Sequence, residues 1–174
     1  MRTSLLISVW VLGFSVSVMK DLYKYPRLYL NDEFQKNETI ALSTEHAHYL
    51  KNVLRRSVGD ALRVFNGRDG EWLAEITVLG KKKGSITLAR QIKEQTGPDH
   101  KVHLLFSPIK KQRMDMLIEK AVELGVTDLH PILTNRTESR KINEDRIKAQ
   151  ITEASEQCER LDVPALHPLM LCRK

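Results

Sequence analysis

Cysteine is scarce in this sequence, and its scarcity narrows the classes of site that the chain can carry. Only two cysteines, Cys158 and Cys172, occur among the 174 residues. Two isolated cysteines form neither the paired spacing of a zinc site nor the framework of a disulfide-stapled domain. We therefore expect no metal site, and this cysteine usage is typical of a protein from a reducing compartment.

A large excess of one charge is also missing from every region. The net charge of +6 comes from 28 basic and 22 acidic residues. Residues 1–26 hold 3 basic and 1 acidic side chains, residues 27–100 hold 12 and 10, and residues 101–174 hold 13 and 11. A site for a polyanion must therefore come from local clustering. The hydrophobic content of 41% is ordinary for a soluble globular protein with one domain or two small ones.

Long hydrophobic runs are absent except at the N-terminus. No charged residue lies between Arg2 and Lys20, and residues 5–19 resemble the apolar region of a signal peptide or a short anchor. At roughly 15 residues, this run is shorter than the ~20 that a transmembrane helix needs. A third interpretation is that translation begins at Met19 or nearby. The choice among the three depends on the rest of the chain.

Residues 27–92 have the short, closely spaced strands of a small antiparallel barrel. Strands are predicted at 61–65 and 72–79 on either side of the turn sequence at 66–70, and a second turn at 80–84 leads into residues 85–90. Ser43 is suited to cap a helix over residues 44–55. The inner face of that helix is expected to hold Ala47, Leu50, Val53 and Leu54.

The same helix carries a basic strip of His48, Lys51 and Arg55, at spacings of three and four residues. Basic side chains clustered in this way can contact phosphates, and each neutralised phosphate adds salt-sensitive affinity. Arg56 follows directly, and Arg68 lies on the neighbouring hairpin, so we expect all five to bind RNA. An ordinary solvated helix face is the alternative interpretation.

Residues 102–133 are predicted to form one βαβ unit. Apolar strands at 102–106 and 126–133 flank a helix over 114–124, and Gly125 is suited to end that helix. Strands this apolar are expected to have helices on both faces. Ligands of such parallel sheets lie beyond the carboxyl ends of the strands, so Lys110, Lys111 and Arg136 are candidate site residues. A solvated surface is again the alternative.

Polar segments bound this unit on both sides. Residues 95–100 have the composition of a linker, with a domain boundary near Gly97. After the polar loop at 134–140, Asn143 is suited to cap another helix. The inner face of that helix is expected to hold Ile147, Ile151, Ala154 and Cys158. The segment between Pro164 and Pro168 would normally lead into a further strand.

Several separated motifs together resemble the RsmE family, the 16S ribosomal RNA (uracil-N(3))-methyltransferases. The resemblance covers about residues 26 to 169, in the order of the family, and is specific because the motifs agree with one another. They are Arg27–Leu30, His48–Arg55 with Gly59 and Asp60, Glu119–Val126 with Pro131, Arg136, and Glu153–Arg160 with Pro164.

The resemblance implies a domain order and a fold class. Residues 26–96 would form an α+β, PUA-like barrel that holds RNA, residues 97–101 a linker, and residues 102–174 the N-terminal part of an α/β SPOUT methyltransferase domain. Residues 1–25 are then an atypical apolar extension. Because the family is cytosolic and begins near the position of Arg27, we favour an aberrant or vestigial start, a cytoplasmic protein and no stable membrane partner.

The resemblance also implies a reaction, a cofactor and partners. The family uses S-adenosylmethionine to methylate a uridine at N3 in 16S ribosomal RNA of the small subunit, usually as a homodimer. On this basis we expect Arg136 and Glu119 to be catalytic, with no residue assigned as general base. Lys110 and Lys111 are expected to bind RNA, and Lys120, Gln157 and Arg160 to brace the pocket.

One departure from the family pattern concerns the cofactor. Family members continue through a Gly-Pro-Glu-Gly-Gly loop and an Arg-Ile-Leu-Arg-type segment that form a knot, and neither motif occurs here. We therefore assign no cofactor-binding residues, and expect this chain neither to bind S-adenosylmethionine nor to transfer methyl groups. The alternative to an enzyme is an RNA-binding remnant. An incomplete sheet would leave an uncovered apolar edge beside residues 102–106 or 126–133.

Overall fold

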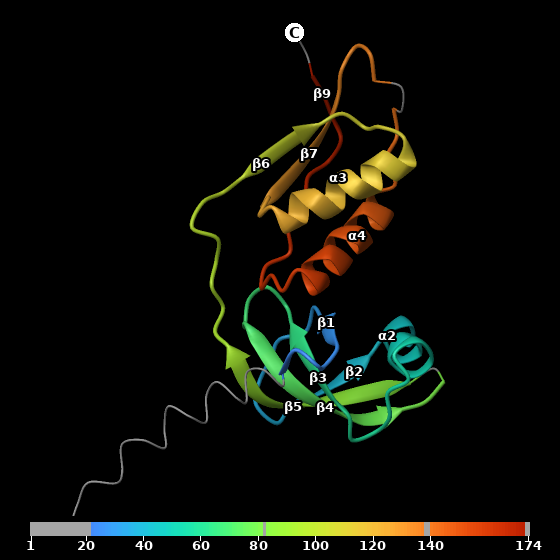
Figure 1. Cartoon of the computed structure of the whole chain (residues 1–174), viewed down its shortest axis with the longest axis vertical. Helices are drawn as coiled ribbons and strands as arrows, with labels where there is room; N and C mark the ends of the chain where they lie inside the picture. Colours follow the sequence, from blue (N-terminus) through green and yellow to red (C-terminus); the bar gives the residue numbers. More distant parts are fainter. Residues whose placement is uncertain (1–21, 82, 138–139, 173–174) are drawn as a thin grey trace, which may run out of the picture. The chain divides into compact units, whose positions relative to one another are not determined.

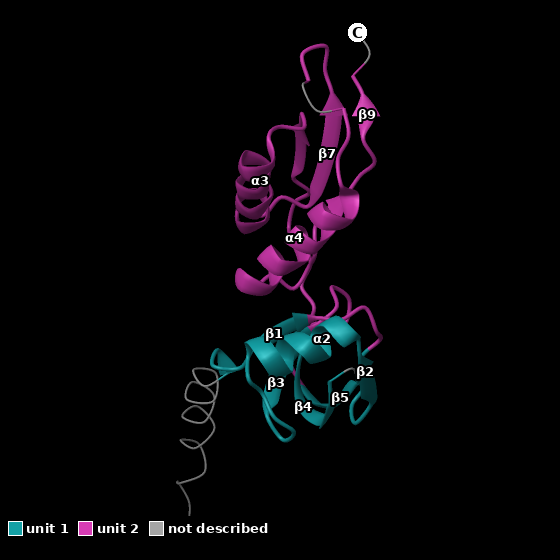
Figure 2. Cartoon of the chain, turned by 90° about the vertical axis from the view of Figure 1, so that its right-hand side faces the viewer, with its two compact units in different colours: residues 1–28, 34–64, 72–90 teal, residues 29–33, 65–71, 91–174 magenta. Residues whose placement is uncertain are grey.

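The computed structural model describes residues 22–81, 83–137 and 140–172 (Figure 1). The chain divides into two compact units, neither of which is continuous in sequence (Figure 2). Unit 1 consists of residues 1–28, 34–64 and 72–90, and unit 2 of residues 29–33, 65–71 and 91–174. The domain limits at residues 96 and 102 stay predictions, and the apolar run at 2–20 lies outside the described residues.

Unit 1 is built around a five-stranded sheet with the strand order β1-β3-β4-β5-β2. The strands are β1 (Arg27–Tyr29), β2 (Thr39–Leu42), β3 (Ala61–Phe65), β4 (Glu71–Leu79) and β5 (Gly84–Lys93). Leu62, Val64, Ile76, Ile86 and Leu88 are fully buried in its core. The two hairpins were predicted from their turns, whereas β2 was missed because it is four residues long and pairs with the distant β5.

The helix predicted over residues 44–55 is interrupted. It consists of α2 (Thr44–His48), capped by the Ser43 side chain, and a π-helical turn, η1 (Tyr49–Val53). Ala47 and Leu50 are buried as expected, but Val53 is 59% exposed, so its assignment to the inner face is wrong. In the π-turn the Leu54 N–H bonds to the Tyr49 carbonyl, which rotates later residues out of the α-helical phase.

Unit 2 contains the predicted βαβ unit and a second helix. Its elements are β6 (His103–Phe106), α3 (Lys111–Glu123), β7 (Asp128–Leu133), α4 (Glu144–Gln157), β8 (Ala165–Leu166) and β9 (Met170–Leu171). Strands β6, β8 and β9 all pair with β7 in parallel. Gly125 has a φ of +88°, as its predicted capping role requires. The Asn143 side chain accepts a hydrogen bond from the Arg146 N–H and so caps α4.

The expectation that helices cover both faces of this sheet is wrong for the residues that the structure describes. Helices α3 and α4 share one core with Phe106 and Leu129. Leu105, whose side chain points to the opposite face, is 61% exposed. Strand β7, within the expected 126–133, is paired on both sides and is not an edge of the sheet. Of the two expected edges, the one beside residues 102–106 therefore remains, at β6.

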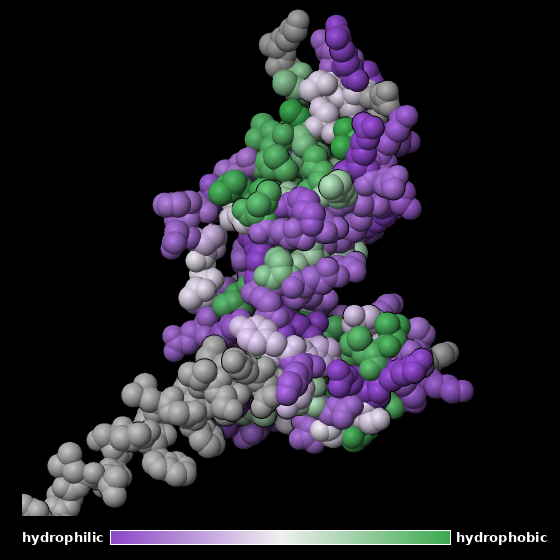
Figure 3. Space-filling model, viewed as in Figure 1, coloured by the Kyte–Doolittle hydropathy of each residue, from purple (hydrophilic) through white to green (hydrophobic). Residues whose placement is uncertain are grey.

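An apolar surface lies beside β6 and α3 (Figure 3). Its hollow has a volume of about 440 Å³, and Arg113 and Lys120 supply its only charged lining among the described residues. The apolar lining is Leu104, Ile109, Met116, Leu117, Ala121, Leu124 and Val126. In the described part of the chain, no helix is both long and apolar enough to span a membrane.

Candidate functional site

A hollow rich in positive charge lies beyond the carboxyl ends of β6 and β7, where the sheet topology predicted a site. We call it the cationic cleft; its volume is about 390 Å³. The structure brings Lys110 and Arg136 together there, and adds Arg113 from the first turn of α3. Among the described residues, the lining is Ser107, Pro108, Ile109, Lys110, Arg113, Thr134, Arg136 and Thr137.

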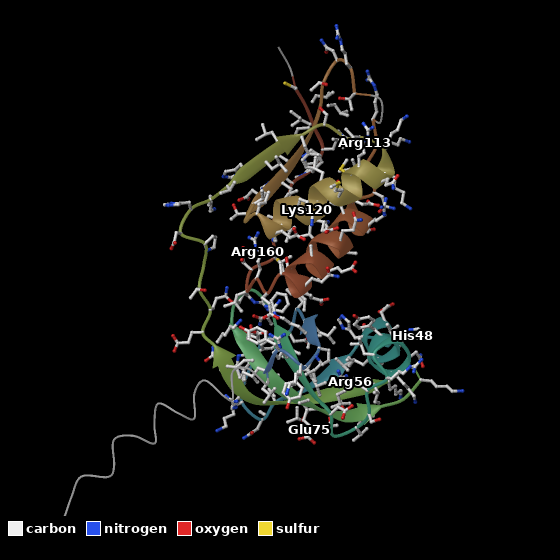
Figure 4. All side chains as sticks on the ribbon, in the orientation of Figure 1. His48, Arg56, Glu75, Arg113, Lys120 and Arg160 are labelled. Carbon is white, nitrogen blue, oxygen red and sulfur yellow. The ribbon has the colours of Figure 1, made fainter. Side chains whose placement is uncertain are left out.

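Short loops after the two strands position these cations. Lys110 lies directly before α3, and Arg113 lies within the first turn of that helix (Figure 4). After β7, the Thr134 N–H donates to the Thr137 Oγ1 at 2.8 Å, which fixes the turn that carries Arg136. Lys111 is not among the lining residues. Sequence reasoning missed Arg113, although its spacing of three residues from Lys110 was a usable signal.

A second hollow, of about 350 Å³, shares Arg136 with the cationic cleft. Its other lining residues are Thr134, Asn135 and Cys172, and the Cys172 thiol is free and exposed. Arg136 is therefore accessible from two neighbouring hollows.

Glu119, the other expected catalytic residue, lines a different hollow between α3 and α4. That hollow measures about 130 Å³, and Gln157 is also part of its lining. The Glu119 carboxylate accepts a hydrogen bond from Lys120 Nζ at 2.9 Å, and Lys120 also binds Glu123. Hydrogen bonds to Glu123 and then Glu119 raise the pKa of Lys120. Among the described hollows, none is lined by both Glu119 and Arg136, so their joint catalytic role stays a prediction.

Arg160 contacts backbone carbonyls and a carboxylate. Its Nη1 donates to the carbonyls of Val122 and Val126 at 2.7 and 2.9 Å, and its Nη2 binds Asp162 at 2.5 Å. Arg160, which is labelled in Figure 4, therefore links the segment after α4 to the end of α3 and to the residues before β7. The side chain is only 12% exposed, so its contacts are largely shielded from water.

The basic strip of unit 1 keeps an accessible surface despite the interrupted helix. His48, Lys51 and Arg55 are exposed, whereas Arg56 is half-buried. Arg55 has a φ of 53°, so the strip turns with the backbone instead of continuing along one helix face. Arg68 belongs to unit 2, where its guanidinium donates to the carbonyls of Asn31 and Asp32 at 2.9 and 3.5 Å.

Two family models match the chain. Residues 96–174 match an RNA methyltransferase domain, and residues 42–88 match an RNA methyltransferase PUA domain. Ribosomal RNA small subunit methyltransferase E of Rickettsia conorii is 38% identical over 144 residues, covering 82% of this chain and 59% of the relative. The chain therefore spans about three fifths of the length of that curated relative.

Solved structures are similar to this chain in fold. A ribosomal RNA small subunit methyltransferase E from Neisseria gonorrhoeae, crystallised with S-adenosyl methionine, matches with a TM-score of 0.76 at 27% identity. A protein from Legionella pneumophila, solved with the cofactor bound, matches with a TM-score of 0.77 at 30% identity. Each match covers 84% of this chain, with 62% of the first structure and 63% of the second.

Proposed function

Since this chain belongs to the ribosomal RNA small subunit methyltransferase E family, we propose that it acts in the S-adenosylmethionine-dependent methylation of a uridine at N3 in 16S ribosomal RNA. The observation that carries the proposal is the cationic cleft, with Lys110, Arg113 and Arg136 at the carboxyl ends of two parallel strands. Parallel sheets bind their ligands at this edge. Pairing into a homodimer, as in the family, stays a prediction.

The chemistry of uridine gives the cations of the cleft a role. The N3–H of uracil is weakly acidic, and N3 becomes a nucleophile as its proton leaves. Negative charge then develops on the base, and preorganised cations stabilise such charge most in a partly dehydrated site. In this proposal Arg136 faces the base, whereas Lys110 and Arg113 bind the flanking phosphates. The bound cofactor would supply an electrophilic methyl group.

The described lining of the cleft does not fit the whole cofactor. Its described residues include three cationic side chains and no carboxylate, whereas S-adenosylmethionine carries a positively charged sulfonium. Like charges in one cleft repel, so this lining suits RNA phosphates and an anionic base. This observation favours a second candidate function for the 174-residue chain, RNA binding without methyl transfer.

One experiment separates these functions. The purified chain is titrated with S-adenosylmethionine by calorimetry, and methyl transfer is measured on small ribosomal subunits that lack the modification. RNA binding with neither cofactor binding nor turnover would support the second function, because the described residues of the cleft include no carboxylate. Cofactor binding with turnover would establish the first function for the chain itself. Failure to bind the subunit or its RNA would contradict both.

Replacing Lys51 and Arg55 with alanine is expected to weaken RNA binding through unit 1. If each side chain neutralises one phosphate, the slope of log affinity against log salt should fall by roughly two. Binding of a 16S RNA fragment is measured across a series of salt concentrations. The matched control replaces Lys36 and Arg90, two exposed basic residues outside the strip, and should keep the original slope. If the Lys51/Arg55 double variant kept the slope of the original chain, as the control should, the strip would be ordinary solvated surface.

A further inference from the structure

Three histidines and an aspartate gather on the face of the unit 2 sheet opposite its helices. In the parallel register, His103 of β6 pairs with Asp128 of β7, and Leu105 pairs with His130. Leu104, Leu129 and Leu166 pack in the helix-covered core, so the residues alternating with them point to the other face. His167 follows β8, and its backbone N–H donates a hydrogen bond to the Leu129 carbonyl.

The donor atoms of three of these residues are close enough to share one ion. His103 Nδ1 lies 3.0 Å from His130 Nε2 and 3.8 Å from Asp128 Oδ2. One donor atom from each of the three lies within 4.8 Å of the other two. Bonds of about 2.0–2.2 Å around a tetrahedral metal ion place neighbouring ligand atoms about 3.4 Å apart. The separations of 3.0 and 3.8 Å lie on either side of that value.

Neighbouring groups orient these ligands. Asp128 Oδ1 is 2.8 Å from His167 Nε2, and Asp128 Oδ2 accepts a hydrogen bond from Thr127 Oγ1 at 2.8 Å. The His167 ring stacks on His130, with centroids 4.0 Å apart and the planes 13° apart. Such outer partners fix the orientation of metal ligands and tune their basicity.

We propose that His103, Asp128 and His130 bind one divalent transition-metal cation of the zinc and nickel class, with His167 supporting Asp128 from outside. Two imidazoles favour such ions over Mg²⁺ or Ca²⁺, which prefer oxygen ligands. The ion would link β6 to β7 at the amino end of β7, away from the cationic cleft at the carboxyl ends. The proposed site is independent of methyl transfer, and it differs from the sequence-based expectation of no metal site.

The test uses the full 174-residue chain after removal of metal with a chelator. Co²⁺ is titrated while its visible absorption spectrum reports coordination, and Zn²⁺ is then added as a competitor. We expect one Co²⁺ per chain, displaced by Zn²⁺. His103→Ala and Asp128→Asn, which each alter a proposed ligand, should lower the affinity most. His167→Ala should lower it less, by roughly 10–100-fold, because that residue contacts Asp128 and not the ion.

Matched controls separate this site from adventitious binding. His100→Ala removes a nearby exposed histidine outside the cluster, and Cys172→Ser removes the exposed thiol; both should bind Co²⁺ as the original chain does. Thermal unfolding of metal-free His103→Ala and Asp128→Asn checks that each variant is folded. Unchanged affinity in both folded variants, loss of binding in Cys172→Ser, or absence of Co²⁺ binding would each overturn the proposal and leave a hydrogen-bonded histidine pair.

Discussion

Gly70→Ala is expected to lower the free energy of unfolding by about 3 kcal/mol or more, because two separate costs coincide at this position. Gly70 has a φ of +74°, a conformation that strains any residue with a Cβ. An added Cβ would lie 2.2 Å from the Lys93 carbonyl oxygen and 2.8 Å from the Gln95 N atom. Both are backbone atoms, so a side-chain rotation cannot relieve the clash.

Gly67→Ala is the matched control in the same turn. Gly67 has a similar φ of +79°, but its nearest neighbour to an added Cβ is the Leu161 carbonyl oxygen at 3.8 Å. Only the backbone strain remains there, so the expected cost is about 1 kcal/mol. Urea unfolding followed by tryptophan fluorescence measures both variants, since Trp72 lies two positions after Gly70. Equal, small losses of stability would contradict the described approach of the backbone at Gly70.

Arg160→Met is expected to lower the free energy of unfolding of unit 2 by about 2–4 kcal/mol. The family resemblance had instead suggested that Arg160 braces a pocket. The substitution removes one donor from the Val126 carbonyl and the charge partner from Asp162. The Val122 carbonyl also loses this donor but still accepts from the Gly125 N–H. Each buried polar group left unsatisfied costs about 1–3 kcal/mol. Methionine keeps most of the apolar stem volume, so the loss reports mainly on the guanidinium contacts.

Lys148→Met is the control for removing a cation. Lys148 is 57% exposed and lies 3.8 Å from Glu144 on the outside of α4, so its loss should cost no more than about 0.5 kcal/mol. Denaturant unfolding is measured for both variants. Adding Asp162→Asn and the Arg160→Met/Asp162→Asn double variant completes a cycle that gives the coupling energy of Arg160 and Asp162. If Arg160→Met were as mild as Lys148→Met, the guanidinium contacts would contribute little to stability.

The candidate site was partly accessible to sequence reasoning. Two apolar strands joined by one helix indicated a parallel pair, and parallel strands end at the same edge of a sheet. That inference brought Lys110 and Arg136 together in the cationic cleft, where the structure has them. It failed to group Glu119 with Arg136, because a position along α3 does not say which hollow the helix face borders. The motifs identified the family, but not the contacts of each residue.

Local patterns were enough to determine the hairpin turn at 66–70, the end of α3 at Gly125 and the cap of α4 at Asn143, because each depends on residues a few positions apart. The tertiary structure alone decided the rest. It determined that Gly70 faces the backbone of residues 93–95, that Arg160 binds the end of α3, and that three histidines meet beside Asp128. These contacts join segments far apart in the chain, so no local periodicity or capping pattern reports them.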